Sequence, residues 1–107
     1  MKKVILSVAM MFCGTLLFAQ MNNSTVNQTG NGNGSDVDQT GMTNLSTVDQ
    51  TGDNNGSDVD QVGVSNDSDV DQVGNDNGST VDQVGNNNQS DVTSTGDLNT
   101  SIVLQGY

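Results

Sequence analysis

Hydrophobic and polar residues alternate along the chain from position 24 onward, and the alternation returns every 11 residues. Each unit begins S-[TD]-V-D-Q-[TV]-G, so Ser, Val, Gln and Gly fall at every second position. A period of two is typical of a β-strand, because successive side chains point to opposite faces. The unit continues as G-x-x-N-x, and Gly, Asn and Asp favour turns because they tolerate a positive φ. Every unit therefore predicts one strand of about six residues and one turn.

The repeat runs without insertion or deletion to position 107, and we treat 24–107 as one repeat domain. Seven full units occupy residues 24–34, 35–45, 46–56, 57–67, 68–78, 79–89 and 90–100, and a partial eighth covers 101–107. Five positions of the unit recur in phase, which a random polar linker would not sustain, and they are candidates for structural columns. The serines are Ser24, Ser35, Ser46, Ser57, Ser68 and Ser79; the valines are Val26, Val37, Val48, Val59, Val70 and Val81; the glutamines are Gln28, Gln39, Gln50, Gln61, Gln72 and Gln83; the glycines are Gly30, Gly41, Gly52, Gly63, Gly74 and Gly85; the asparagines are Asn33, Asn44, Asn55, Asn66, Asn77 and Asn88.

These units predict an all-β fold, a short two-sheet β-solenoid (β-helix) with amyloid-like stacking. Two units close one rung of 22 residues, and successive rungs stack at about 4.8 Å. Odd-numbered units form one sheet, even-numbered units form the facing sheet, and the chain makes about three and a half rungs. Identical residues then lie above one another, so the glutamines form amide ladders along each sheet and the valines form thin apolar ladders between the sheets.

Residues 1–19 are predicted to be a secretory signal peptide, cleaved after Ala19. Lys2 and Lys3 supply the positive start, and residues 4–18 are mostly apolar. The apolar run is short for a transmembrane helix, so membrane insertion is not expected. Cys13 follows a bulky residue where a lipobox needs a small one, and we interpret it as part of the signal. Residues 20–23 form a short segment before the first unit.

Composition narrows the possible functions further. After position 19 the chain has 13 aspartates and no Lys, Arg or His, which gives a charge of −13. Nucleic acid binding needs cations that neutralise phosphate, so it is not expected, and neither is docking on anionic membranes. The same part of the chain contains no His and no Cys, which removes most nucleophilic and zinc chemistry. We therefore predict a protein that is not an enzyme and uses no cofactor.

The repeat resembles the curlin repeat of bacterial curli amyloid subunits, whose pattern is Q-x-G-x-x-N-x-A-x-x-x-Q. The pattern reappears from Gln28 through Gly30, Asn33 and Ser35 to Gln39, with Ser in place of the usual Ala, and it recurs four times up to Gln83. It fails at position 94, where Ser replaces the expected Gln. The two half-repeats are also alike, and the segment before the first unit is shorter than the family's usual secretion-targeting segment.

This resemblance implies a structural subunit of an extracellular fibre on the bacterial surface, which acts in adhesion and biofilm matrix. The implied partners are further copies of the chain in a homopolymer, a nucleating subunit and a dedicated outer-membrane export pore. One alternative is that the chain is itself the minor, nucleating subunit of the same fibre.

A soluble β-solenoid that binds calcium or ice is a second alternative. Paired aspartates on one strand are weak calcium candidates because hard cations favour oxygen clusters, although no EF-hand or RTX spacing is present. The competing interpretation is a solvated acidic face that keeps the chain soluble. Outward threonines could form an ice-binding array, but later units replace them with Asp and Val. Repeated N-x-S sequons are interpreted as a by-product of the repeat. The calcium candidates are Asp36, Asp38, Asp58, Asp60, Asp69 and Asp71.

Overall fold

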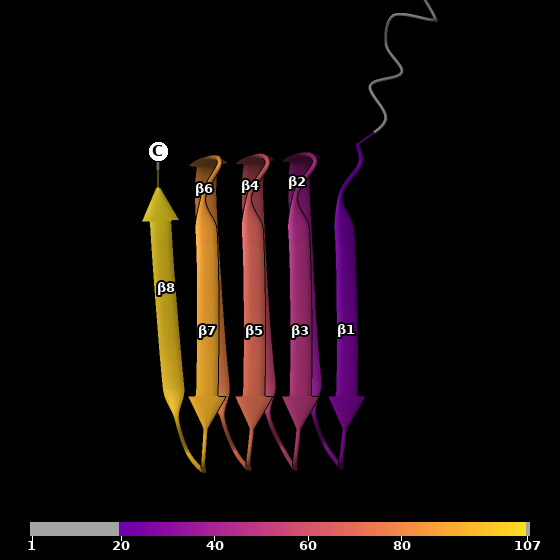
Figure 1. Cartoon of the computed structure of the whole chain (residues 1–107), viewed down its shortest axis with the longest axis vertical. Coiled ribbons are helices and arrows are strands. Elements are labelled where there is room, and N and C mark those ends of the chain that lie inside the picture. The colour runs from indigo at the N-terminus through magenta and orange to yellow at the C-terminus, as the bar shows by residue number, and fades with distance from the viewer. Residues whose placement is uncertain (1–19, 107) are drawn as a thin grey trace, which may run out of the picture.

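The computed structural model describes residues 20–106, and within that range the chain forms eight β-strands and no helix (Figure 1). No helix of this part is therefore long and apolar enough to cross a membrane. The predicted signal peptide, residues 1–19, and Tyr107 lie outside the described residues. The first sheet contains β1 (Asn23–Thr29), β3 (Leu45–Thr51), β5 (Asp67–Val73) and β7 (Gln89–Thr95), and the second contains β2 (Gly34–Met42), β4 (Gly56–Val64), β6 (Gly78–Asn86) and β8 (Thr100–Gly106).

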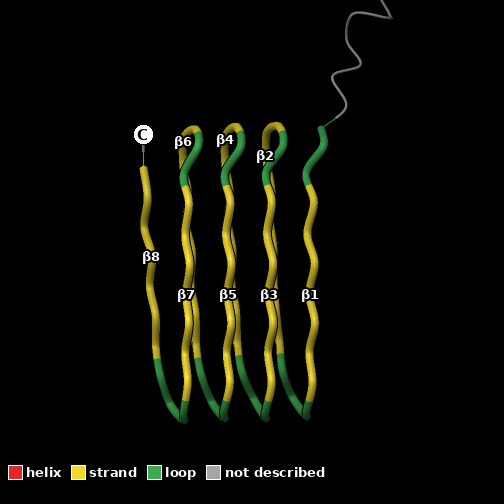
Figure 2. Tube along the Cα trace, in the orientation of Figure 1, coloured by secondary structure: helices red, strands yellow, loops and turns green. Residues whose placement is uncertain are grey.

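All strand pairs are parallel, and each residue pairs with the residue 22 positions later, as Val26 does with Val48. The strand order is β1-β3-β5-β7 in one sheet and β2-β4-β6-β8 in the other. Figure 2 shows the chain passing from one sheet to the other through short turns at both ends of the strands. The predicted two-sheet β-solenoid, with odd and even units in separate sheets, is confirmed. The partial eighth unit forms a complete strand, β8, so there are four rungs rather than three and a half.

The two half-repeats differ in the structure, although their sequences are alike. Strands of the first sheet have 7 residues, whereas β2, β4 and β6 have 9. The difference begins at the second residue of the turn. In the turn after β1, the Asn31 N–H donates to Asp53 Oδ1 at 2.8 Å, although its carbonyl oxygen still accepts the Asn54 N–H at 2.8 Å. In the second sheet the strand pairing continues through this position, from Met42 to Val64 and from Val64 to Asn86.

The core between the sheets is thin, with one fully buried valine per strand in the middle rungs. Val37 and Val103 pack against this set from the end rungs. Serines and glutamines fill the rest of the inner face, as the period-two pattern requires. Six buried serine hydroxyls have no hydrogen-bond partner, Ser57 and Ser68 among them. The five buried valines are Val48, Val59, Val70, Val81 and Val92.

Glycine is required where one turn stacks on the next. Gly52 has φ 122°, and a Cβ built on it would lie 1.9 Å from the carbonyl oxygen of Gly74 in the following rung. Gly56, at the start of β4, has no heavy atom within 4 Å of the equivalent point. The two glycines are four residues apart, yet only at Gly52 does the neighbouring rung leave no room for a side chain.

We expect Gly52→Ala to lower the free energy of unfolding by at least about 2 kcal/mol, because it adds both a disfavoured φ and a backbone clash. Gly56→Ala is the matched control, and its effect should stay within about 0.5 kcal/mol. Urea unfolding followed by circular dichroism measures both. Similar losses from the two substitutions would contradict the stacking seen at the turn.

Candidate assembly site: the ladders and the open ends

Buried glutamines form a hydrogen-bonded column along each sheet. In the first sheet, Gln28 Nε2 donates to Gln50 Oε1 at 2.7 Å, and Gln50 Nε2 donates to Gln72 Oε1 at 2.8 Å. The second N–H of Gln50 donates to the backbone oxygen of Gly34 in the facing sheet at 3.1 Å. Each central glutamine amide is therefore hydrogen-bonded both to the neighbouring rungs of its own sheet and to the backbone of the facing sheet. The second column runs through Gln39, Gln61, Gln83 and Gln105, with amide distances of 2.7, 2.8 and 2.8 Å.

The two glutamine columns end differently. In the first sheet the column stops at Ser94, so Gln72 Nε2 keeps its bond to Gly56 O in the facing sheet, at 3.0 Å, but meets no further glutamine. In the second sheet it continues to Gln105 in the last strand. Gln105 was not among the predicted column residues because the eighth unit is incomplete. Its place 22 residues after Gln83 is the signal that could have identified it.

Asparagines form a second set of columns at the turns. The Asn66 N–H donates to Asn44 Oδ1 at 3.1 Å, and the Asn66 side chain donates to the backbone of Val62 at 3.3 Å and of Gly85 at 3.2 Å. These side chains are almost fully buried, so the bonds replace water that the turn backbone would otherwise need. The predicted asparagine positions thus lie where they close the turn and join it to the neighbouring rung.

Aspartates occupy the outer faces in columns set by the strand register. Asp38, Asp60 and Asp82 stack in the second sheet, and Asp49 stacks on Asp71 in the first. Partial burial, and then the charges of Asp82 and Asp38, raise the pKa of Asp60 above its ordinary value. Electrostatic repulsion between these carboxylates therefore lowers the stability of the folded chain.

The pKa of Asp69 is raised in the same way, first by partial burial and then by the charges of Asp91 and Asp49. Within residues 20–106, no three His, Cys, Asp or Glu side chains gather closely enough to hold a metal ion. The six calcium candidates are thus spread along columns rather than collected around a point. The threonine column begins Thr25, Thr47 and then passes to Asp69.

Within residues 20–106, both ends of the solenoid are open. At the first rung, Val26 is 42% exposed, whereas Val48 in the next rung of the same column is fully buried. At the other end, β7 and β8 each have a strand neighbour on one side only. Exposed edges of this kind present unpaired backbone groups to another chain. The ladders and the edges together form a surface that one more rung would complete.

Gln50→Leu combined with Gln72→Leu is expected to destabilise the folded chain, and to slow fibre growth if the chain assembles, because each orphaned buried amide or carbonyl costs roughly 1–3 kcal/mol. Asp53→Asn with Asp76→Asn is the control: Asn keeps the Oδ1 atom that accepts from Asn31 and also tolerates a positive φ. Thioflavin kinetics and urea midpoints measure both effects. Equal effects of the two double variants would mean that the glutamine columns do not hold the stack.

Stability should fall as pH rises from about 4 to 8. A raised pKa in the folded state means that this state binds more protons, so the stabilisation is complete below the ordinary value of about 3.9 and is lost as pH rises through the folded value. Asp60→Asn with Asp69→Asn should reduce the difference between urea midpoints at pH 4 and pH 8. Asp76→Asn, which has no Asp 22 residues before or after it, should leave it unchanged. The same pH difference in all three proteins would argue against stacked carboxylates as its source.

Comparison with known proteins identifies the repeat. A family model described as the curlin associated repeat matches residues 30–63, 52–85 and 63–96, which together span more than half of the chain. Every matched stretch begins and ends on a glycine of the repeat column. No curated protein and no solved structure matches the chain significantly. The in-phase columns and the three matches lead to one conclusion: the chain belongs to the curlin associated repeat family.

Proposed function

We propose that this protein is a structural subunit of an extracellular, curli-like amyloid fibre, which grows when copies stack end to end and acts in cell adhesion and biofilm matrix. Its repeats and its β-solenoid fold support a curli-type structural fibre subunit rather than an enzyme. The observation that carries the proposal is the pair of uncapped ends. Solenoids that stay monomeric normally end in polar caps, and within residues 20–106 neither end carries one.

End-to-end stacking of copies would bury apolar surface that a single chain leaves exposed. The core holds about one valine per strand, and the end valines are only partly covered, so a lone chain buries little apolar surface. A second copy in the same 22-residue register would cover Val26 and continue both sheets. Because an end joins to a different end, the contact is heterologous and does not close, which produces a filament.

The family and the sequence of residues 1–19 support a proposal for export and partners. We expect cleavage after Ala19, passage through a dedicated outer-membrane pore, and growth from a nucleating subunit. Thirteen aspartates without a cation after position 19 support solubility during that passage. The alternative role, as the nucleating subunit itself, predicts that this chain seeds another subunit of the fibre better than it extends its own.

Purified residues 20–107 should convert from soluble chain to thioflavin-binding fibres after a lag. Fibre diffraction should then give the 4.7–4.8 Å repeat of strands stacked along the fibre axis. Prolonged monomeric behaviour would instead support a soluble binding solenoid. Aged samples without that reflection would refute the fibre proposal.

A further inference from the structure

Asparagine precedes glycine four times in the part of the chain that the structure describes, always where a turn leads from the first sheet to the second. The asparagine amide is thermolabile, and a following glycine leaves it open to attack because no Cβ shields the glycine nitrogen. Ring closure needs both the side-chain amide of Asn and the backbone N–H of Gly. Reactivity therefore depends on the hydrogen bonds that the fold places on these groups. The pairs are Asn31–Gly32, Asn33–Gly34, Asn55–Gly56 and Asn77–Gly78.

In the middle rungs both reacting groups are held. Asn55 Nδ2 donates to Gly74 O at 2.9 Å, and Asn55 Oδ1 accepts the Asn77 N–H at 3.1 Å. The Gly56 N–H donates to Asn77 O at 2.7 Å. One rung later the equivalent bonds of Asn77 and Gly78 measure 2.8 to 3.0 Å. Attack by the glycine nitrogen would break bonds on both groups at once, in a turn where Asn55 is only 1% exposed.

The first rung shows that hydrogen bonds hold such a pair even with less burial. Asn33 is half-buried, since within residues 20–106 no rung precedes it. Even so, Asn33 Nδ2 donates to Gly52 O at 2.9 Å, and Asn33 Oδ1 accepts the Asn55 N–H at 2.9 Å. The Gly34 N–H donates to Asn55 O at 2.8 Å. Asn33 therefore carries the same restraints as Asn55.

The Asn31–Gly32 pair lacks these restraints. Asn31 is exposed, and its Nδ2 makes a single long bond, to Asp53 Oδ1 at 3.3 Å. Among residues 20–106, neither Asn31 Oδ1 nor the Gly32 N–H has a hydrogen-bond partner. The backbone is nevertheless held, because the Asn31 N–H donates to Asp53 Oδ1 and Asn31 O accepts the Asn54 N–H, both at 2.8 Å. The two reacting groups are thus unpaired in a turn whose backbone is in place.

We propose that Asn31 is the site at which the folded chain deamidates. The Gly32 nitrogen attacks Asn31 Cγ, its proton leaves with the amide nitrogen as ammonia, and a succinimide ring forms. Water then adds to one of the two ring carbonyls and opens the ring, which gives aspartate or isoaspartate at position 31. The net reaction consumes one water, releases one ammonia and replaces an amide by a carboxyl group.

The product brings a second carboxylate to Asp53. Asn31 begins a turn column in which amide and carboxylate alternate, and each backbone N–H donates to the side-chain oxygen of the next rung at 2.8 to 2.9 Å. Deamidation replaces the Nδ2 donor by an oxygen that repels Asp53. Isoaspartate also adds one carbon to the backbone of the turn. The modified chain therefore gains a negative charge and loses a bond between its first two rungs. The column residues are Asn31, Asp53, Asn75 and Asp97.

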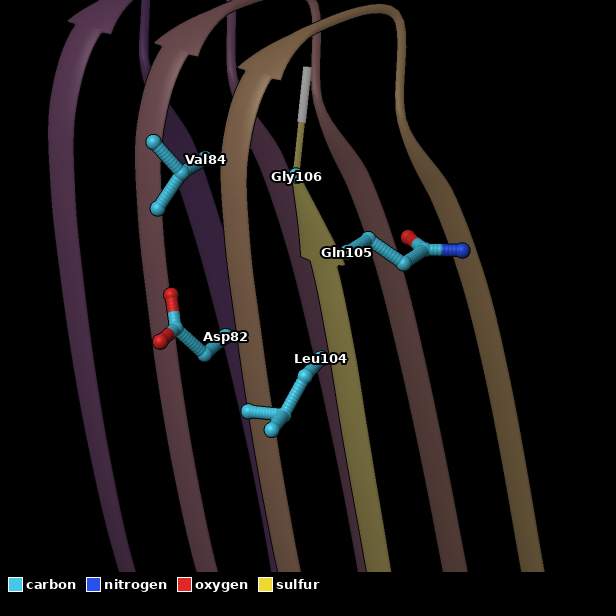
Figure 3. A pocket seen from close by; sticks show the side chains of 5 residues that line it. All are labelled: Asp82, Val84, Leu104, Gln105 and Gly106. Atoms are coloured by element: carbon cyan, nitrogen blue, oxygen red, sulfur yellow. The ribbon is translucent and has the colours of Figure 1, made fainter.

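A glutamine that precedes glycine in the last strand is held by the fold. Gln105 is followed by Gly106, and Figure 3 shows its side chain on the opposite side of β8 from Leu104, which borders an open hollow. Gln105 Oε1 accepts from Gln83 Nε2 at 2.8 Å, and Gln105 Nε2 donates to Gln89 O at 2.7 Å. Both polar atoms of this amide are engaged, although it lies in an end rung. A place at the end of the stack is therefore not sufficient to free an amide.

Mass spectrometry of residues 20–107 tests the site. Intact masses and fragment ions would follow deamidation at mildly alkaline pH, in chain that circular dichroism shows to be folded and in chain unfolded by urea. Asn31 should react within about threefold of its rate in urea, whereas Asn33, Asn55 and Asn77 should react at least about tenfold more slowly than in urea, because they must await unfolding. Equal protection of all four asparagines, or equal reactivity of all four in the folded chain, would overturn the proposal.

Gly32→Asp is the matched control. Asp76 occupies the equivalent place two rungs later with φ 55°, and a Cβ at Gly32 would closely approach only Asn54 Oδ1, the end of a flexible side chain. The added side chain should slow deamidation of Asn31 at least about fivefold, because it hinders attack by the backbone nitrogen. Unchanged deamidation at Asn31 in this variant would refute the route through Gly32. Neither measurement needs fibres, so the outcome is independent of the proposed fibre function.

Discussion

Three glutamines in the middle of the stack are buried between the two sheets and hydrogen-bond to the glutamines one rung before and one rung after them: Gln50, Gln61 and Gln83. Gln61 and Gln72 have no meaningful exposure, and a buried amide without partners costs roughly 1–3 kcal/mol. The partner must lie in the same column, so the register of 22 residues is fixed by chemistry as well as by turn length. A slip of one residue would turn the buried valines outward and the aspartates of the outer strand faces inward.

The same requirement leaves the ends of the molecule unsatisfied. In the middle of the stack, Gln50 has an amide neighbour on both sides, but Gln39 and Gln105 have one on a single side. A globular protein resolves such ends with caps. Here the first and last rungs keep the inner residues of the central rungs except at Ser94, which replaces a glutamine, so most of the bonds that hold one chain together are also bonds that a second chain can make. Fold stability and assembly thus depend on one interaction.

Charge on the outer faces opposes this stacking. Parallel, in-register strands place identical residues together, which favours amides and valines but brings carboxylates such as Asp60 and Asp82 side by side. Partial burial, and then the charges of Asp82 and Asp38, raise the pKa of Asp60. Because Thr93 and Leu104 replace Asp in the last strands, these two carboxylate columns end one strand before the end of the stack.

The sequence alone determined the 11-residue period, the inward Ser, Val and Gln positions, the division into two sheets and the parallel register, because a strict repeat allows only equivalent residues to stack. Tertiary structure decided the features that depend on a neighbour one rung away. Strands β2, β4 and β6 of the second sheet are longer than those of the first, because strand pairing continues through Met42, Val64 and Asn86, whereas the Asn31 N–H donates to the Asp53 side chain. The incomplete eighth unit forms a full strand because β6 supplies its ladder partners, and the amide columns acquire a direction that composition cannot specify. A periodic pattern shows which residues meet, whereas the direction and satisfaction of each hydrogen bond are set only when both partners are in place.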